Sequence, residues 1–326
     1  MTRRLLLAVA VLGTAVCLIL AFRGLDWSAA WDALRSCEFV WLIPAFVLFS
    51  GTILVRAVRW RYLFLPERRP PMLAVMRATV LGYLYLSVLP VRAGEPARIL
   101  VLNRLAGTPK VEIAGTAVVE RVFDLAVLLT CFFALSPWLP TGSWAHPLAI
   151  LAGVAGLLIG AVIVTLRLTG DRGLRVLLRP FGLLPRVGRD AAEEAATSLR
   201  HGLAGLHDAS TALLALGFTL VSWLLLGASC AVALRAFDLG VPPQAGMLVV
   251  IAVSLGASLP SLPGGVGIFE AASIAALSAY GISHADALAF GLVWHALNLV
   301  PFLIFGPPLA LLLGRRSRRD QSVPTL

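Results

Sequence analysis

The sequence predicts an all-α integral membrane protein with six transmembrane helices and two re-entrant, broken-helix hairpins that are related as an inverted repeat. The 326 residues are 59% hydrophobic and only 13% charged, which is about half the charged fraction of a soluble domain. Several apolar runs approach the ~20 residues that a helix needs to cross a bilayer. The motif Leu-Pro-x-x-x-Gly starts at Leu89 and again at Leu262, and a helix break in each half of a membrane protein is typical of a transport site.

The six expected spans are the longest apolar runs, at residues 5–22, 39–55, 111–135, 146–166, 212–234 and 285–313. Arg3 and Arg4 precede the first run, but no small-x-small cleavage site closes it, so we interpret it as a retained span rather than a signal peptide. We expect one polytopic membrane domain over residues 1–314. Its first half covers about 1–167, an amphipathic cytoplasmic connector about 168–210 and its second half about 211–314, and a basic cytoplasmic tail follows at 315–326.

Arginine clusters orient the spans, because the cytoplasmic loops of membrane proteins are enriched in Lys and Arg. Such clusters follow the second span, run through residues 167–200 and form the tail at 315–319. We therefore expect a multi-pass protein of the cell inner (plasma) membrane with both termini in the cytoplasm.

The same rule predicts that the first break is re-entrant. If residues 72–89 crossed the membrane once, the basic side chains from Arg92 to Lys110 would lie outside, against the rule. Residues 72–106 are therefore expected to enter from the cytoplasmic side and return to it, with their turn at Pro90–Gly94. Residues 244–281 start and end outside, and the charges leave open whether they form a second hairpin or two full spans.

The charge, cysteine and histidine patterns bear on partners and cofactors. The net charge of +10 comes from arginines that cluster next to span ends, so we expect contacts with anionic lipid headgroups at basic cytoplasmic loops and no nucleic-acid partner. The 4 cysteines and 5 histidines form no CxxC, HxxxH or HExxH pattern, so no metal site and no cofactor is expected. The sequence has no Gly-x-x-x-x-Gly-Lys-Ser/Thr nucleotide loop, so transport would be downhill or driven by a gradient.

Glu120, Arg121 and Asp124 are the clearest candidates for a functional site. At ~1.5 Å per residue they begin ~14 Å into the third span, close to the membrane midplane. Glu120 and Asp124 are four residues apart and share a helix face. Because a charge in hydrocarbon is costly, the group is either a buried ion network that joins helices or a substrate or proton site, and the two roles are compatible.

The candidates at the first break are Arg92, Gly94, Glu95 and Arg98. Pro96 fits the first turn of a new helix, and that helix start would aim free N–H groups and a positive dipole end at the turn. Arg92 and Arg98 add guanidinium groups suited to phosphate. The alternative is an interfacial turn whose arginines extend to the lipid headgroups.

The candidates at the second break are Pro263, Gly264, Gly265, Gly267 and Glu270. Successive glycines permit a backbone nest that binds anions. Glycine-rich kinks also occur in transmembrane helices for packing alone. The nearby carboxylate and the matching break in the first half favour a functional role.

Other polar residues lie within or beside the apolar spans. Arg56 is deep enough in the second span to be a further binding candidate, whereas Arg59 and Trp60 are interpreted as an interfacial anchor. In the last span, His295 and Asn298 are expected to form hydrogen bonds between helices.

Four motifs occur in a specific order along the chain: Arg56-x-x-Arg59-Trp60, Leu89-Pro90-x-Arg92-x-Gly94-Glu95-x-x-Arg98, Glu120-Arg121-x-x-Asp124 and Pro263-Gly264-Gly265-x-Gly267-x-x-Glu270. Together they resemble the flippase-like membrane domain of the lysylphosphatidylglycerol synthase family, over about residues 5–313. In two-part members this domain translocates aminoacylated phosphatidylglycerol, which a soluble transferase domain makes. Stand-alone members are thought to move lipids or polyprenyl-linked sugars. The resemblance implies that the functional ionisable residues are Arg92, Glu95, Arg98, Glu120, Arg121, Asp124 and Glu270.

These observations lead us to expect a membrane lipid translocator, a flippase or scramblase, for a phospholipid or a polyprenyl-phosphate-linked lipid. The cationic break tips near the midplane would bind the lipid phosphate. The chain ends shortly after Arg319, so we expect no transferase domain and no enzymatic activity. Two alternatives stay open: an integral membrane transferase for a lipid-linked substrate, for which no DxD or DDxxD motif is present, and a secondary transporter of a small solute. The sequence also leaves open whether the protein binds a second copy of itself or a separate lipid-modifying enzyme.

Overall fold

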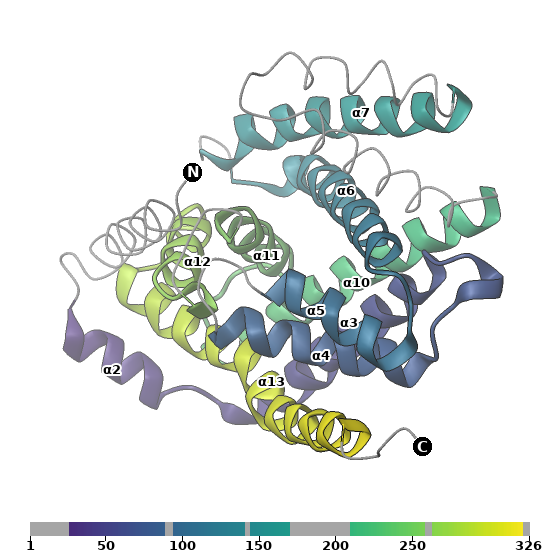
Figure 1. The fold of residues 1–326 in the computed structure, drawn as a ribbon. Helices are drawn as coiled ribbons and strands as arrows, with labels where there is room; N and C mark the ends of the chain where they lie inside the picture. Colours follow the sequence, from purple (N-terminus) through teal and green to yellow (C-terminus); the bar gives the residue numbers. More distant parts are fainter. Residues whose placement is uncertain (1–25, 89–93, 141–143, 170–208, 258–262, 322–326) are drawn as a thin grey trace, which may run out of the picture. The chain divides into compact units, whose positions relative to one another are not determined.

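The computed structural model describes residues 26–88, 94–140, 144–169, 209–257 and 263–321, and the regular structure in these ranges is helical (Figure 1). The α-helices are α2 (Trp27–Arg35), α3 (Leu42–Tyr62), α4 (Met72–Val88), α5 (Gly94–Ala106), α6 (Lys110–Leu135), α7 (Ala145–Thr169), α10 (Ala209–Arg235), α11 (Gln244–Gly256), α12 (Ile268–Ser278) and α13 (His284–Gln321). Short 3-10 turns lie at Phe39–Trp41, Pro66–Arg68, Ser136–Trp138 and Pro263–Gly265. The expected first span, most of the connector, Arg92 and the end of the tail lie outside the described residues.

Three of the expected spans are confirmed as helices that are long and apolar enough to cross a membrane. They are Phe39–Tyr62, Ser210–Arg235 and His284–Leu311. The third and fourth expected spans are also helical, since α6 has 26 residues and α7 has 25. Helix α6 carries three charged residues, Glu120, Arg121 and Asp124, in its middle. That α6 and α7 cross the membrane stays a prediction.

Both predicted breaks separate two helices. Helix α4 ends at Val88 and α5 begins at Gly94, with Pro96 in its first turn as expected. Helix α11 ends at Gly256, and α12 begins at Ile268 after a 3-10 turn. The four helices have 17, 13, 13 and 11 residues, so each is shorter than the ~20 residues that a crossing needs. Their re-entrant course and their relation as an inverted repeat stay predictions.

The chain divides into two compact units. The first contains Met1–Ile53, Met76–Val101 and Leu225–Leu326, and the second contains Leu54–Val75 and Leu102–Leu224. The division falls within α3, α4, α5 and α10, so each of these helices has residues in both units.

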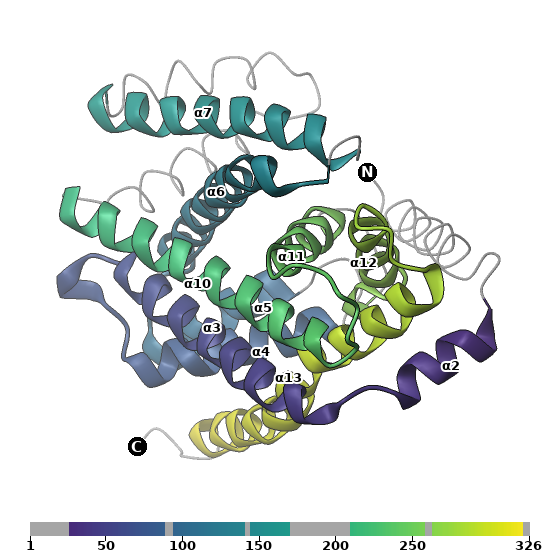
Figure 2. The ribbon, with the colours of Figure 1, turned by 180° about the vertical axis from the view of Figure 1, so that it is seen from behind.

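In the first unit, α12 packs against α11 and α13, and α2 packs against α13, as both views show (Figures 1 and 2). The core of this unit includes Phe290 and Trp294 of α13, which stack with ring centroids 6.4 Å apart and are at most 1% exposed. Gly246 of α11 allows a close approach to α10, because a Cβ atom there would lie 2.5 Å from the backbone N of Ala231. Helix α13 continues through three prolines, Pro301, Pro307 and Pro308.

Helix α2 has the features of a helix at a membrane surface. Its cap residue Asp26 accepts hydrogen bonds from the Ser28 hydroxyl and from the N–H groups of Ser28 and Ala29, and these bonds lower the pKa of Asp26. Trp27 and Trp31 are exposed, and the Arg35 guanidinium lies 5.1 Å from the Trp31 ring centroid. Exposed tryptophan with a nearby arginine is typical of the boundary between lipid and water.

In the second unit, α6 and α7 pack side by side in both views and are joined through the turn Ser136–Trp138 (Figures 1 and 2). Small residues of α7 make this contact close. A Cβ atom on Gly156 would lie 3.5 Å from Leu129 Cβ of α6, and Gly153 faces the ring of Phe133. Close approach at small residues is the usual way in which helices associate within a membrane.

Candidate functional site

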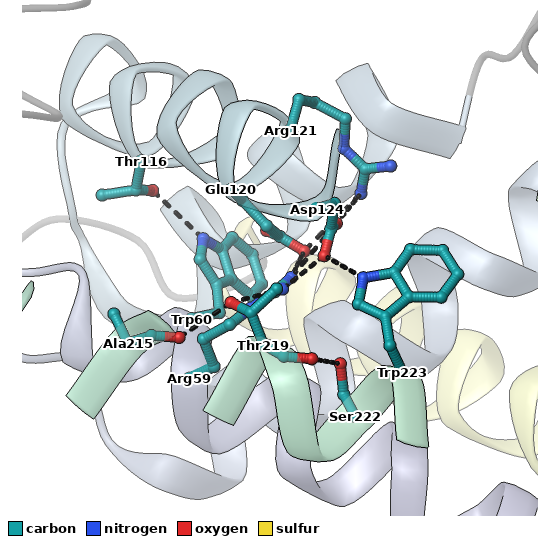
Figure 3. A network of polar contacts seen from close by, with 10 residues as sticks. All are labelled: Arg59, Trp60, Thr116, Glu120, Arg121, Asp124, Ala215, Thr219, Ser222 and Trp223. Carbon is teal, nitrogen blue, oxygen red and sulfur yellow. Dashed lines mark hydrogen bonds and ion pairs between the residues drawn. The ribbon is translucent and has the colours of Figure 1, made fainter. Parts of the chain in front are cut away.

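Arg59 is the centre of a buried polar network in the second unit (Figure 3). It lies in the last turn of α3, and its side chain is 0% exposed. Its Nη2 donates to Glu120 Oε1 at 2.7 Å, and its Nη1 donates to Asp124 Oδ1 at 2.5 Å. One guanidinium group therefore binds two carboxylates, as its planar fork of donors allows.

Helix α6 presents both carboxylates to Arg59 because Glu120 and Asp124 are one helical turn apart. Their side chains are 2% and 10% exposed, so the prediction that they share a face is confirmed and that face is buried. One turn earlier, Thr116 Oγ1 accepts a hydrogen bond from Trp60 Nε1 at 3.1 Å. Trp60 is itself 1% exposed, so the Arg59-Trp60 pair is a buried contact between α3 and α6 rather than the interfacial anchor that we expected.

Helix α10 contributes two further side chains to the network, Thr219 and Trp223 (Figure 3). Arg59 Nη1 also donates to Thr219 Oγ1 at 3.2 Å, and Trp223 Nε1 donates to Asp124 Oδ1 at 3.3 Å. The Thr219 hydroxyl donates in turn to Ala215 O at 2.7 Å. Side chains of α3, α6 and α10 thus meet in one hydrogen-bonded group.

Two more arginines lie at the edge of this network. Arg121 Nη2 lies 3.6 Å from Glu120 Oε1 and 3.8 Å from Asp124 Oδ2, and its side chain is 53% exposed. The Arg56 guanidinium carbon lies 5.0 Å from the ring centroid of Trp223, within the range of a cation–π contact. Arg59 and its two carboxylates carry one net negative charge, which Arg121 balances.

The buried ion network that the sequence predicted as one role of Glu120 and Asp124 is therefore present. A buried carboxylate that loses its cation is strongly destabilising, so the network can hold three helices in one arrangement. That Arg56, Glu120, Arg121 and Asp124 also bind substrate stays a prediction. In the part of the chain that the structure describes, no group of three His, Cys, Asp or Glu side chains could hold a metal ion.

A second buried polar group, in the first unit, pairs Glu270 of α12 with His295 of α13. Glu270 Oε1 lies 2.7 Å from His295 Nδ1, and Glu270 Oε2 accepts from the N–H of Gly267 at 2.7 Å. His295 Nε2 lies 2.9 Å from Gly264 O. The imidazole also stacks on the Phe269 ring, with centroids 4.3 Å apart. Glu270 and His295 are only 3% and 5% exposed.

The two polar residues of the last span behave differently. His295 links α13 to the second break, which confirms the prediction that it bonds outside its own helix. For Asn298 that prediction is wrong, because its Nδ2 donates to Trp294 O in the same helix at 2.7 Å. An amide side chain can satisfy itself on the carbonyl one turn earlier, so a polar residue on an apolar helix need not have a partner elsewhere.

The glycines of the second break adopt the conformations that made them candidates. Gly264, Gly265 and Gly267 have φ values of 74°, 76° and 83°, in the left-handed region that glycine adopts without steric cost. A Cβ atom on Gly264 would lie 3.4 Å from Ser87 O, in the last turn of α4. The end of α4, next to the first break, therefore lies beside the second break. Pro263 begins this turn.

At the first break, the helices on either side are in close contact. A Cβ atom on Gly94 would lie 2.5 Å from Gly82 O, and one on Gly82 would lie 2.9 Å from Arg98 Cβ. Arg98 is 9% exposed, whereas Glu95 is exposed. Arg92 lies outside the described residues. The described candidates of both breaks belong to the first unit, and Arg56, Glu120, Arg121 and Asp124 belong to the second.

Sequence reasoning missed the central position of Arg59 and the contributions of Thr219 and Trp223. Arg59 and Glu120 are 61 residues apart, and a single sequence does not pair distant residues. One signal was available, because an arginine in an apolar span needs a carboxylate partner and the third span offers Glu120 and Asp124.

Comparison with known proteins identifies the family of this chain. The family described as the lysylphosphatidylglycerol synthase TM region has a model that matches residues 5–306. A protein described as a UPF0104 membrane protein, from Methanothermobacter thermautotrophicus, is 24% identical over 254 residues, which is 74% of this chain and 75% of the relative. The family match includes both helix breaks and both buried polar groups. The chain therefore belongs to the family of lysylphosphatidylglycerol synthase transmembrane regions, which its four ordered motifs had suggested.

Proposed function

We propose that this membrane protein is a lipid translocator, a flippase or scramblase, for a phospholipid or a polyprenyl-phosphate-linked lipid. The observation that carries the proposal is the juxtaposition of two helix breaks, where Gly264 meets Ser87 O at the end of α4. A lipid headgroup that crosses the bilayer needs polar partners in place of water. Two broken helices side by side bring helix ends to one location, as in transporters that bind substrate near the midplane.

The lengths of the broken helices support the re-entrant topology that this function needs. At ~1.5 Å per residue, α4 is ~26 Å long and α5, α11 and α12 are ~17–20 Å long. All are shorter than the ~30 Å hydrocarbon core. We propose that each pair enters and leaves on one side, so that the breaks lie within the membrane.

The charges near the first break suit a phosphate. The start of α5 directs its first N–H groups toward the break, where a helix N-terminus favours an anion. Arg98 lies one turn into α5 and is mostly buried beside Gly82. We propose that Arg92 and Arg98 bind the lipid phosphate together with Gly94, Pro263, Gly264, Gly265 and Gly267. Glu95 and Glu270 would contact a cationic or hydroxylated headgroup or carry protons.

The buried network around Arg59 has a related role in this proposal. The charges of Arg59, Arg121, Glu120 and Asp124 cancel, so this group can remain inside the membrane. The Arg121 side chain is half exposed and accessible to a headgroup. We propose that Arg56, Glu120, Arg121 and Asp124 bind the lipid transiently and that no covalent chemistry occurs.

The test is lipid movement in liposomes that contain the purified protein. A fluorescent phospholipid and, separately, a fluorescent polyprenyl-phosphate analogue are placed in both leaflets, and a membrane-impermeant quencher reports which leaflet holds them. We expect wild-type protein to expose the inner-leaflet label, and Arg92→Ala, Arg98→Ala and Glu120→Gln to abolish this movement with folding intact. Glu67→Gln is the matched control, because Glu67 is an exposed carboxylate outside the candidate site.

Two results would count against the proposal. Equal movement in wild type and in all three site variants would mean that these residues do not bind the lipid. No movement of any lipid in a broad panel would refute translocation. Metal-dependent turnover of a lipid-linked substrate, or uptake of a water-soluble one, would then identify the correct alternative.

A further inference from the structure

The contacts of His295 determine how many protons it shares with Glu270. A backbone carbonyl can only accept a hydrogen bond, so His295 Nε2 must carry a proton to bond Gly264 O at 2.9 Å. Glu270 Oε2 accepts from the N–H of Gly267. The remaining contact, 2.7 Å between His295 Nδ1 and Glu270 Oε1, needs one more proton, on either the ring or the carboxyl group. The observed arrangement therefore holds two protons.

Loss of one proton breaks one of these contacts. Both ring nitrogens of His295 face oxygen atoms, and a neutral imidazole has one N–H. With Glu270 ionised, one nitrogen of the neutral ring has no proton. Its lone pair then faces an oxygen lone pair, either at Nδ1 against Glu270 Oε1 or at Nε2 against Gly264 O. A buried acceptor left without a donor is unfavourable, so the ring must separate from Glu270 or from Gly264. Either movement loosens the connection between α13 and the turn at the second break.

Within the described residues, this pair forms no ion pair or hydrogen bond with another ionisable side chain. Glu270 and His295 contact no ionisable side chain there except each other. Helix α11 has no ionisable residue and α12 has only Glu270. The ionisable residues of the other neighbouring elements are His284 and Asp286 at the start of α13, Arg315, Arg316, Arg318, Arg319 and Asp320 at its end, Tyr280 between α12 and α13, Asp32 and Arg35 of α2, Arg77, Tyr83 and Tyr85 of α4, and Glu95 and Arg98 of α5. His284 and Asp286 are ~14–17 Å along the helix from His295, at ~1.5 Å per residue.

We propose that Glu270 and His295 form a proton-binding site, and that proton release frees the turn at residues 263–267 from α13 and thereby drives or gates lipid movement. The link to lipid rests on the proposed function, whereas the proton site rests on the contacts alone. The step is a proton transfer from the Glu270–His295 hydrogen bond to water, and no bond between heavy atoms changes. The freed turn includes Gly264, which lies against the end of α4 at Ser87, so the change acts where the two breaks meet.

Glu270→Gln is the informative variant, because glutamine reproduces the protonated state. Its amide oxygen accepts from the Gly267 N–H and its amide nitrogen donates to a neutral His295 Nδ1, while Nε2 keeps its bond to Gly264 O. Every contact is retained, and the carboxyl group that shares a proton with His295 is absent. Glu67→Gln is the matched control, with the same chemical change at an exposed position.

The first measurement does not depend on lipid. Hydrogen exchange of the amides at residues 264–267 is followed by mass spectrometry across the pH range of stable protein, after correction for the intrinsic rate at each pH. In wild type and Glu67→Gln we expect protection to fall by about tenfold per pH unit above the transition, as for one linked proton. In Glu270→Gln we expect constant protection. Constant protection in wild type would overturn the proton site.

The second measurement is lipid movement in the same liposomes with different internal and external pH. We expect the wild-type and Glu67→Gln rates to change with pH by up to about tenfold per unit, and the Glu270→Gln rate to be independent of it. A wild-type rate of lipid movement that does not depend on pH would overturn the coupling between proton release and lipid movement, while leaving the lipid function intact. If no lipid moves but exchange depends on Glu270, the lipid function fails and the proton site stands.

Discussion

Replacing Arg59 by methionine is expected to destabilise the protein strongly. Methionine fills most of the volume but leaves Glu120 and Asp124 without the cation that bonds them at 2.7 and 2.5 Å. Removing one partner of a buried ion pair costs about 3–5 kcal/mol, because the other charge stays buried and uncompensated.

The surroundings of Glu120 and Asp124 determine where in this range the loss of stability should fall. Glu120 is almost fully buried, whereas Asp124 is 10% exposed and keeps its bond from Trp223. Arg121 still attracts both carboxylates, but its side chain is 53% exposed, so solvent screens this contribution. We therefore expect a loss of about 3–4 kcal/mol. Arg59→Lys should lose less, since a lysine keeps the charge but not the two-pronged geometry.

The assay is unfolding of purified protein in detergent, followed by tryptophan fluorescence, with Arg121→Met as the control. That arginine has similar partners but is half exposed, so its replacement should cost less than about 1 kcal/mol. Combining Arg59→Met with Glu120→Gln and Asp124→Asn should recover part of the loss, because no buried charge then remains. Equal losses for Arg59→Met and Arg121→Met, or a triple variant no more stable than Arg59→Met, would refute this explanation of the network.

Two further substitutions test individual contacts. Trp223→Phe removes the Nε1 bond to Asp124 but keeps an aromatic ring, so we expect a loss of about 0.5–1.5 kcal/mol in the same unfolding assay; no loss would mean that the bond contributes nothing. Gly246→Ala places a Cβ atom 2.5 Å from the backbone of Ala231, and such overpacking should cost about 1–3 kcal/mol. Its control is Gly217→Ala, where no atom lies within 4 Å; similar effects of the two substitutions would contradict the close packing of α10 and α11.

Local features of the fold could be predicted from the sequence because each depends on residues that are close in the chain. The apolar runs predicted three helices of membrane-spanning length, and proline and glycine predicted the interruptions before Gly94 and Ile268. The four-residue spacing of Glu120 and Asp124 predicted one shared face. These predictions need only helical geometry and the conformational preferences of single residues.

Pairs of distant residues could not be predicted in this way. The sequence identified His295 as a residue that bonds outside its helix but gave no reason to choose Glu270, 25 residues away. Arg59 was assigned to the membrane surface because an Arg-Trp pair is usual there, yet α6 and α10 cover it completely. Burial of that arginine depends on which helices are neighbours, and that information lies in the tertiary packing rather than in the pattern of any one helix.

The three prolines of α13 have a mechanical consequence. Each proline lacks an N–H group, so the carbonyl groups of Leu297, Leu303 and Ile304 lose their usual donor four residues later. A helix bends more easily where a rung of its hydrogen-bond ladder is missing. The first such position, where the helix bends more easily, is at Pro301, six residues beyond His295. The segment of α13 that holds the second break can therefore tilt without moving the rest of the helix by the same angle.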